Sequence, residues 1–311
     1  MVEGGLGELR FVQVDVFTDT VFGGNPLAVV FGADGLPSET MQKVAREMNC
    51  SETTFLLVPT RSDCAGRVRI FTPAREIPFA GHPTIGTAWV MATEGLLPVG
   101  TTRFSLEEGI GPVEVMLEGD PANPSFLWMR HGEVKFGPEL GNREGFARAL
   151  GLEASDLLAG QPIRPGSTGS TFLYIPLRDR ETVDRARLDV PALLAAQGEG
   201  PKLGVFVFAP DPGPDPKSGA GRVYSRMFAP HTSGVPEDPA TGSASGPLGA
   251  YLVERGLVAA AETVDIVSAQ GVKMGRPSAV HIRVGMREGR VGEILVGGGV
   301  VPVIDGRLRL S

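Results

Sequence analysis

Two similar segments lie about half the chain length apart, and this internal repeat constrains the fold more than any other feature of the sequence. Residues 69–88 read RIFTPAREIPFAGHPTIGTA, and residues 226–244 read RMFAPHTSGVPEDPATGSA. The matching residues occur in the same order, and similar strands are expected on either side. This agreement argues against a chance match between two loops rich in glycine and proline. The repeat predicts two domains of one fold, with the matching loops lining one cleft, where ligands usually bind.

Length and composition are consistent with two domains. The chain has 311 residues, of which 42% are hydrophobic and 21% charged, as in ordinary globular proteins. Its 43 glycines and 26 prolines favour many turns between short strands over a helical bundle. The net charge of −7 argues against a nucleic-acid partner, because phosphate binding requires clustered lysine and arginine. A small anionic substrate stays open, since backbone N–H groups also bind anions.

The sequence has no pattern typical of a metal site, a disulfide scaffold or a membrane span. Its two cysteines, Cys50 and Cys64, are too far apart for a CxxC motif, and no HExxH motif occurs. The first residues lack the apolar core of a secretory signal, and no apolar stretch is long enough to cross a bilayer. We therefore expect a soluble, cytoplasmic protein with no metal and no membrane partner.

A helix outside the repeated segments is expected over residues 37–49, PSETMQKVAREMN. Ser38 is the expected N-cap, and Asn49 is the expected end of the helix. The buried face follows the spacing i, i+3, i+4, i+7, which places on it Met41, Val44, Ala45 and Met48. A strand then begins after the segment CSE, which is expected at a turn between helix and strand.

Each repeated loop is expected to end at the start of a helix. Residues 67–73 and 222–230 have the pattern of strands, and residues 83–95 and 242–256 have the pattern of helices. At a helix start the first N–H groups are unpaired and the helix dipole is positive. Two such starts facing one cleft predict a site for a small anionic substrate.

The acid–base groups on the two loops are His82 and Asp238, and they fall opposite each other when the segments are aligned from their shared glycines and alanines. A histidine in a Gly-His-Pro loop is more often structural than catalytic, and an aspartate before proline is a common turn residue. The repeat favours a functional interpretation of both, because the two positions coincide.

Several blocks of the sequence resemble the PhzF-like phenazine biosynthesis proteins. The blocks that carry the resemblance are SETTF at 51–55, FTPAREIPFAGHPTIGTA at 71–88, and EDPATGSA at 237–244. GGNPLAVV at 23–30 and QGVKMGRPS at 270–278 look similar too. Because the resemblance runs from about Val14 to the glycines at 297–299, it covers nearly the whole chain.

The resemblance implies an α+β fold of the diaminopimelate epimerase-like type. Such a fold has two pseudo-symmetric repeats, each a curved mixed sheet around a central helix, with the active-site cleft between them. We expect the N-terminal repeat over 1–130 and the C-terminal repeat over 131–296, with a last strand at about 297–311 that packs back on the first repeat. The resemblance also implies no cofactor and a homodimer. His82 and Asp238 stand where diaminopimelate epimerase carries two catalytic cysteines.

The resemblance further implies an isomerase that moves a hydrogen between carbons, as in the family member that acts on trans-2,3-dihydro-3-hydroxyanthranilate. Glu52 corresponds to the catalytic acid/base of that family, with His82, Asp238 and Ser243 as its partners. Gly81 and Gly242 correspond to backbone contacts with the ligand. Ser51, in the same block as Glu52, is a further expected substrate-binding residue.

Two other functions are compatible with the same residues. In an epimerase or racemase, His82 and Asp238 would act on opposite faces of one carbon. A non-catalytic binding protein could keep the fold and lose the chemistry, although all four expected polar residues, Glu52, His82, Asp238 and Ser243, are present. A carboxylate that moves a proton without metal or Schiff base works best when its pKa is raised toward neutrality. Glu52 is therefore the residue on which the isomerase hypothesis depends.

Overall fold

The computed structural model describes residues 7–211, 213–216, 218–229 and 235–310. Contacts divide the chain into two compact units: unit 1 consists of Met1–Met129 and Gly297–Ser311, and unit 2 consists of Arg130–Val296. Both units combine helices with strands of mixed direction, so the protein is of the α+β class, as predicted. No helix in the described part of the chain has the length and apolar character needed to cross a membrane.

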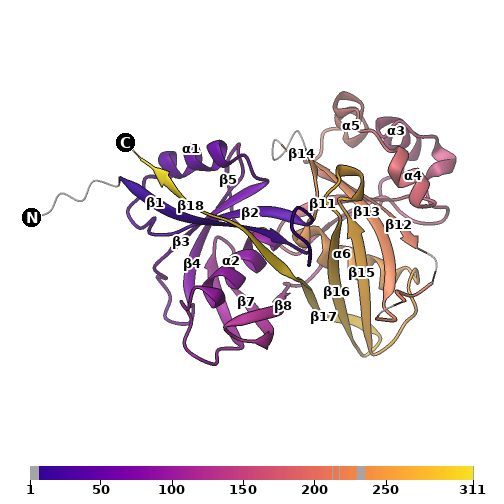
Figure 1. The fold of residues 1–311 in the computed structure, drawn as a ribbon. Coiled ribbons are helices and arrows are strands. Elements are labelled where there is room, and N and C mark those ends of the chain that lie inside the picture. Colours follow the sequence, from indigo (N-terminus) through magenta and orange to yellow (C-terminus); the bar gives the residue numbers. More distant parts are fainter. Residues whose placement is uncertain (1–6, 212, 217, 230–234, 311) are drawn as a thin grey trace, which may run out of the picture. The chain divides into compact units, whose positions relative to one another are not determined.

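Unit 1 is built on a mixed sheet (Figure 1). The central antiparallel strand β1 (Glu8–Val16) lies between β2 (Asn25–Val30) and β18 (Val300–Arg309). Strand β2 pairs in parallel with β3 (Glu52–Leu57), which pairs in antiparallel fashion with β4 (Gly66–Phe71). Strand β4 then pairs with the short β5 (Glu76–Ile77) and, in parallel, with β6 (Arg103–Glu108). The meander ends with β7 (Gly111–Asp120) and β8 (Asn123–Arg130).

Two helices pack on the sheet of unit 1. Helix α1 (Ser38–Met48) buries Met41, Val44 and Ala45, and Asn49 ends it in the left-handed conformation with φ 51°, as predicted. Met48, the fourth residue predicted on the buried face, is only half-buried. The predicted N-cap is wrong: Pro37 occupies that position and makes no side-chain cap, while Ser38 is the first helical residue. The hydroxyl of Ser38 instead accepts a hydrogen bond from Arg69.

Helix α2 (Gly81–Thr93) is buried along nearly its whole length, because it contacts β1, β2 and β3. A Cβ at Gly86 would lie 2.6 Å from Leu27 Cδ2, so glycine at this position allows the close approach of helix and sheet. A helix enclosed in this way needs apolar residues on every side, and α2 therefore lacks the amphipathic pattern of α1.

Unit 2 contains a second set of paired strands with its own buried helix (Figure 1). Its strands are β9 (Lys135–Phe136), β10 (Arg164–Ser167), β11 (Thr171–Pro176), β12 (Gly204–Asp211), β13 (Gly221–Ala229), β14 (Val235–Asp238), β15 (Thr263–Gln270), β16 (Ser278–Arg287) and β17 (Arg290–Gly298). Its helices are α3 (Arg143–Ala149), α4 (Arg180–Arg185), α5 (Val190–Gln197) and the buried α6 (Gly242–Glu254). Short 3-10 turns occur at Ala154–Asp156 and Val272–Met274. A core of mostly aliphatic side chains lies between the small helices and strands β11 and β12.

The order strand, short strand, buried helix, strand occurs once in each unit. It runs β4–β5–α2–β6 in unit 1 and β13–β14–α6–β15 in unit 2, and in both the first and last strands pair in parallel. The first strand carries an arginine that binds a glutamate of the short strand through two hydrogen bonds, Arg69 with Glu76 and Arg226 with Glu237. The two units thus share local hydrogen bonds as well as element order.

These contacts align the two segments differently from the sequence. Arg69 and Glu76 are seven residues apart and Arg226 and Glu237 are eleven apart, so the second segment has 11 − 7 = 4 extra residues before the short strand ends. Counted from the helix start, His82 corresponds to Ser243, since each is the second helical residue. Asp238 ends β14 instead. The sequence alignment that pairs His82 with Asp238 needs the four extra residues of the second segment to follow the loop, whereas the Arg–Glu contacts place them before it. Loops rich in glycine and proline can be aligned in more than one register, so the sequence alone does not decide between the two.

Candidate functional site

Glu52 and His82 are brought together in unit 1. Glu52 is the first residue of β3 and His82 is the second residue of α2, and Oε2 of Glu52 lies 3.5 Å from Nε2 of His82. The His82 side chain is 3% exposed and the Glu52 side chain 14%. The separation exceeds the usual length of a hydrogen bond, so the two groups are close neighbours that another hydrogen-bonding group can join.

Asn25 fixes the orientation of His82 from the opposite side. Asn25 is the first residue of β2, and its Nδ2 donates to Nδ1 of His82 at 3.0 Å. With Nδ1 as acceptor, the proton of the neutral ring is assigned to Nε2, which faces Glu52. Sequence reasoning missed Asn25, although the residue lies inside the block GGNPLAVV that carries the family resemblance.

Burial determines the charge of His82. Removing the ring from water disfavours the imidazolium and lowers the pKa of His82 to about 3. His82 is therefore neutral near neutral pH, so it and Glu52 do not form an ion pair there. A neutral Nε2–H is a hydrogen-bond donor, while the carboxylate of Glu52 is the proton acceptor of the pair.

We expect His82 to stay neutral between pH about 5 and about 8. Because the pKa of His82 is lower in the folded state than its ordinary value, the unfolded chain gains a proton first as the pH falls. His82 therefore costs stability progressively below pH about 6.5 and costs none above it. Proton NMR titration of the four histidines, with His82→Asn to assign the signal, measures this. A His82 signal that titrates near pH 6.5 would contradict the expectation.

Ser51 and Gly81 directly precede Glu52 and His82 in the chain. Ser51 precedes β3 and is half-buried, directly before Glu52. Gly81 is the first residue of α2, and the preceding Ala80 has no side chain that could cap the helix. The first N–H groups of α2 have no acceptors within the helix, and they supply positive partial charge at the helix start that carries His82.

The other predicted residues gather in unit 2, at the start of α6. Asp238 ends β14 and is 7% exposed, and its Oδ2 accepts a 2.6 Å hydrogen bond from Thr241 Oγ1. Gly242 and Ser243 are the first two residues of α6, and both are buried. The segment EDPATGSA thus places a carboxylate, a hydroxyl and a helix start within one turn of chain.

Gln270 holds this turn, and sequence reasoning missed it. Its Nε2 donates to the carbonyl of Asp238 at 2.8 Å and to Thr241 Oγ1 at 3.0 Å, while its Oε1 accepts from Thr241 N at 3.1 Å. The next residue, Gly271, has φ 72°, and a Cβ there would lie 2.6 Å from the Pro239 carbonyl oxygen. In the block QGVKMGRPS, which carries part of the family resemblance, these contacts explain why a glutamine and a glycine come first.

The predicted residues therefore form two groups, one in each unit. Unit 1 holds Ser51, Glu52, Gly81 and His82, and unit 2 holds Asp238, Gly242 and Ser243. Among the described residues, no three His, Cys, Asp or Glu side chains gather as a metal site would require. Cys50 and Cys64 are both buried, and burial raises the pKa of the Cys64 thiol. The acid–base chemistry available in unit 1 is that of a carboxylate beside a neutral imidazole.

Comparison with known proteins gives a consistent result. The family model described as "Phenazine biosynthesis-like protein" matches residues 14–306. Trans-2,3-dihydro-3-hydroxyanthranilate isomerase from Pseudomonas aeruginosa is 35% identical over 302 residues, which cover 97% of this chain and 99% of that protein.

Two solved structures extend the likeness to the fold. A phenazine biosynthesis protein of the PhzF family from Bacillus anthracis has a TM-score of 0.85 at 26% identity, covering 97% of this chain and 99% of that one. A structure described as a predicted epimerase from Pseudomonas aeruginosa has a TM-score of 0.77 at 33% identity, with the same coverage. The relatives named here thus include both an isomerase and a predicted epimerase.

Proposed function

Because the chain belongs to the phenazine biosynthesis-like protein family, we propose that it is a cofactor-independent isomerase that shifts a proton in a small cyclic or amino-acid-like carboxylate. The observation that carries the proposal is the Glu52 carboxylate 3.5 Å from a buried, neutral His82. The family and the names of the relatives support isomerase activity in general; the substrate class and the mechanism are our proposal.

In the proposed mechanism Glu52 is the acid/base. Its carboxylate removes a proton from one carbon, the double bond shifts, and the resulting carboxylic acid returns the proton to another carbon. Both C–H bonds are accounted for and nothing is oxidised or reduced. One positioned acid/base contributes about 10²- to 10⁴-fold to the rate. The Nε2–H of His82 stabilises negative charge that develops on the substrate, as donors in a buried site do.

We assign substrate binding to the helix starts and to the second group of residues. The backbone N–H groups of Gly81 and Gly242 would bind a carboxylate, since helix N-termini attract anions. The hydroxyl of Ser243 and the carboxylate of Asp238, which Thr241 orients, would bind polar groups of the substrate. That both groups of residues serve one substrate, and that the protein forms a homodimer, stay predictions from the sequence.

We also propose that the two units arose by duplication. The proposal is supported by the shared order of elements and by the matching Arg–Glu pairs. A further match lies at the helix starts: Thr84 Oγ1 donates to the carbonyl of Ala80, and Ser245 Oγ donates to the carbonyl of Thr241, each four residues earlier. Under this alignment the acid–base residues of the two units are not equivalent.

The second candidate is an epimerase that uses one base on each face of a carbon. This second candidate is supported by the likeness of the chain to a structure described as a predicted epimerase. It differs from the isomerase in its product, because an epimerase returns the proton to the carbon that lost it.

Proton NMR in D₂O tests the proposed function without prior choice between the two reactions. The wild-type protein is incubated with trans-2,3-dihydro-3-hydroxyanthranilate and with a panel of small amino and hydroxy acids. An isomerase yields a new compound in which a double bond has moved. An epimerase yields its substrate inverted at one carbon and deuterated there: a diastereomer where a second stereocentre exists, and otherwise the enantiomer. A Glu52→Gln protein that turns over at the wild-type rate would contradict the assignment of Glu52.

A further inference from the structure

A second glutamate of unit 1, Glu108, is buried where no acid–base chemistry has been assigned. It is the last residue of β6 and is 6% exposed. Its Oε1 lies 2.6 Å from Thr84 Oγ1, and the same hydroxyl lies 2.8 Å from the carbonyl oxygen of Ala80. Ala80 and Thr84 belong to the first turn of α2, which carries His82.

A threonine hydroxyl has a single hydrogen, so it can donate to only one of these two oxygens. The Ala80 carbonyl can only accept, and the hydroxyl must therefore donate to it for that bond to exist. The short contact with Glu108 is then a hydrogen bond only if Glu108 is the donor. Donation by Glu108 requires a protonated carboxyl group.

The surroundings of Glu108 favour the protonated form. Within the described residues no donor forms a hydrogen bond with Glu108 Oε2, which is buried. An ionised carboxylate at this place would lack the donors that buried charges require. In agreement, burial raises the pKa of Glu108 to about 8, against a smaller opposing effect of the Thr84 hydroxyl.

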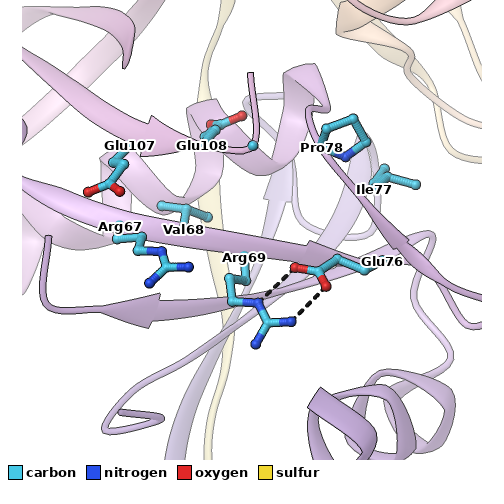
Figure 2. A pocket seen from close by; sticks show the side chains of 9 residues that line it. Arg67, Val68, Arg69, Glu76, Ile77, Pro78, Glu107 and Glu108 are labelled. Carbon is cyan, nitrogen blue, oxygen red and sulfur yellow. Dashed lines mark hydrogen bonds and ion pairs between the residues drawn. The ribbon is translucent and has the colours of Figure 1, made fainter. Parts of the chain in front are cut away.

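The nearby arginines interact with glutamates other than Glu108. A pocket of about 390 Å³ on this part of unit 1 is lined by both guanidinium groups of β4 and by three glutamates: Arg67, Arg69, Glu76, Glu107 and Glu108. Arg69 is bound to Glu76, and Arg67 lies opposite Glu107 in the strand register. Figure 2 shows the carboxyl group of Glu108 turned away from the two guanidinium groups.

The other two elements beside Glu108, α2 and β7, bring no charge to it. The titratable group of α2 is His82, which is neutral, and the residue of β7 that lies opposite Glu108 is Gly111.

Unit 2 has a neutral side chain at the matching position. Gln270 is the last residue of β15, the strand that pairs in parallel with β13 as β6 pairs with β4. Its amide donates to the Thr241 hydroxyl at the start of α6, while Ser245 donates to the Thr241 carbonyl. A side chain on the last strand thus contacts a hydroxyl group at the start of the buried helix in both units. An uncharged glutamine performs this task in unit 2.

We propose that Glu108 is a positioning residue that acts as a neutral carboxylic acid: it donates its proton to Thr84, which donates to Ala80, and so fixes the first turn of α2 and the ring of His82. The effect on turnover rests on the proposed function of His82, whereas the protonation of Glu108 does not. Ionisation forces the Thr84 hydroxyl to donate to Glu108, so its bond to the Ala80 carbonyl is lost. That carbonyl then keeps only the longer main-chain bond from Thr84 N, at 3.3 Å, and the helix start loosens at high pH.

The protonation is tested by unfolding in urea at several pH values, with Glu108→Gln as the neutral mimic and Glu107→Gln as the matched control. In the wild-type protein the unfolded chain releases the Glu108 proton near its ordinary pKa, and the folded protein keeps it up to about pH 8. The unfolding constant of the wild type relative to Glu108→Gln should therefore rise by up to about tenfold per pH unit between these values. Glu107, whose pKa is lowered, should show no such trend. If the unfolding constants of wild type and Glu108→Gln changed in parallel with pH, the proposal would be overturned.

If Glu108→Gln does not fold, carbon NMR of wild-type protein with labelled glutamate carboxyls replaces it. One carboxyl signal should titrate near pH 8 and shift in Thr84→Ser; the absence of any glutamate that titrates above about pH 6.5 would overturn the proposal.

The positioning is tested on the nitrogen NMR signals of the His82 ring, assigned with His82→Asn. These signals should move between about pH 7 and about pH 9.5 in the wild type and stay constant in Glu108→Gln. Turnover should fall severalfold over the same range in the wild type, in kcat more than in KM, and persist in Glu108→Gln. A constant His82 signal in the wild type overturns the positioning. If no turnover is found but the His82 nitrogen signals still move with pH in the wild type, only the proposed function is overturned.

Discussion

Glu52→Gln is expected to lower turnover by about 10²- to 10⁴-fold, because the amide keeps the shape of the side chain and removes its proton exchange. Glu52 begins β3 and its side chain is only 14% exposed, so a variant of the same shape is needed to keep the surrounding packing. The measurement is kcat for wild type and variant at neutral pH, with circular dichroism and urea unfolding to show that the variant folds.

Glu107→Gln is the matched control for this loss. This variant also removes a carboxylate from a strand of unit 1. The Glu107 carboxylate accepts its hydrogen bonds from Thr60 and Arg61 and none from the Glu52–His82 pair. Its turnover should stay near that of the wild type. If Glu52→Gln retains more than about a tenth of the wild-type rate, Glu52 is not the acid/base, since such a group contributes at least about 10²-fold.

Arg226→Met is expected to reduce the free energy of unfolding by about 3–5 kcal/mol, the usual cost of removing one partner of a buried ion pair. Arg226 is 8% exposed and donates to both carboxylate oxygens of Glu237 at 2.8 Å. Its Nη1 also donates to the carbonyls at the end of α4, those of Val183 at 3.0 Å and Ala186 at 2.8 Å. The variant leaves a carboxylate and these carbonyls without their donor.

Arg69→Met is the control that unit 1 supplies. Arg69 binds Glu76 with the same two-bond geometry, but the two side chains are 19% and 43% exposed. Water can replace the lost donor, so we expect Arg69→Met to reduce the free energy of unfolding by about 1 kcal/mol or less. Urea unfolding of both variants gives the comparison. Equal losses would show that burial does not set the strength of these pairs.

Features that depend on local pattern could be predicted from the sequence. The buried face of α1 and its end at Asn49 follow from residue spacing and from the tolerance of asparagine for the left-handed conformation. The family, the α+β class and the starts of both buried helices near the Gly-His-Pro and Thr-Gly-Ser motifs could also be read from the sequence. That Glu52 and His82 act together could be expected only from the family resemblance, because thirty residues separate them in the chain.

Features that depend on tertiary contact could not be predicted. Asn25 reaches His82 across 57 residues, and Gln270 reaches Asp238 across 32, so no local pattern reveals either contact. The protonation of Glu108 depends on its burial beside Thr84, which the acidic pair at the end of β6 does not disclose. Pro37 stands at the N-cap position instead of Ser38, whose hydroxyl accepts a hydrogen bond from Arg69, a residue of another element.

The most direct test of the Glu52 mechanism is the fate of a deuterium at the carbon that loses its hydrogen. Trans-2,3-dihydro-3-hydroxyanthranilate, or whichever substrate the panel identifies, is labelled there and converted in ordinary water under single-turnover conditions. One carboxylic acid in a closed site can return the same hydrogen before solvent replaces it, so the account predicts product with a measurable share of deuterium at the receiving carbon. Complete loss of the label in the first turnover, with none at the receiving carbon, would contradict a single base at Glu52 and favour a two-base reaction.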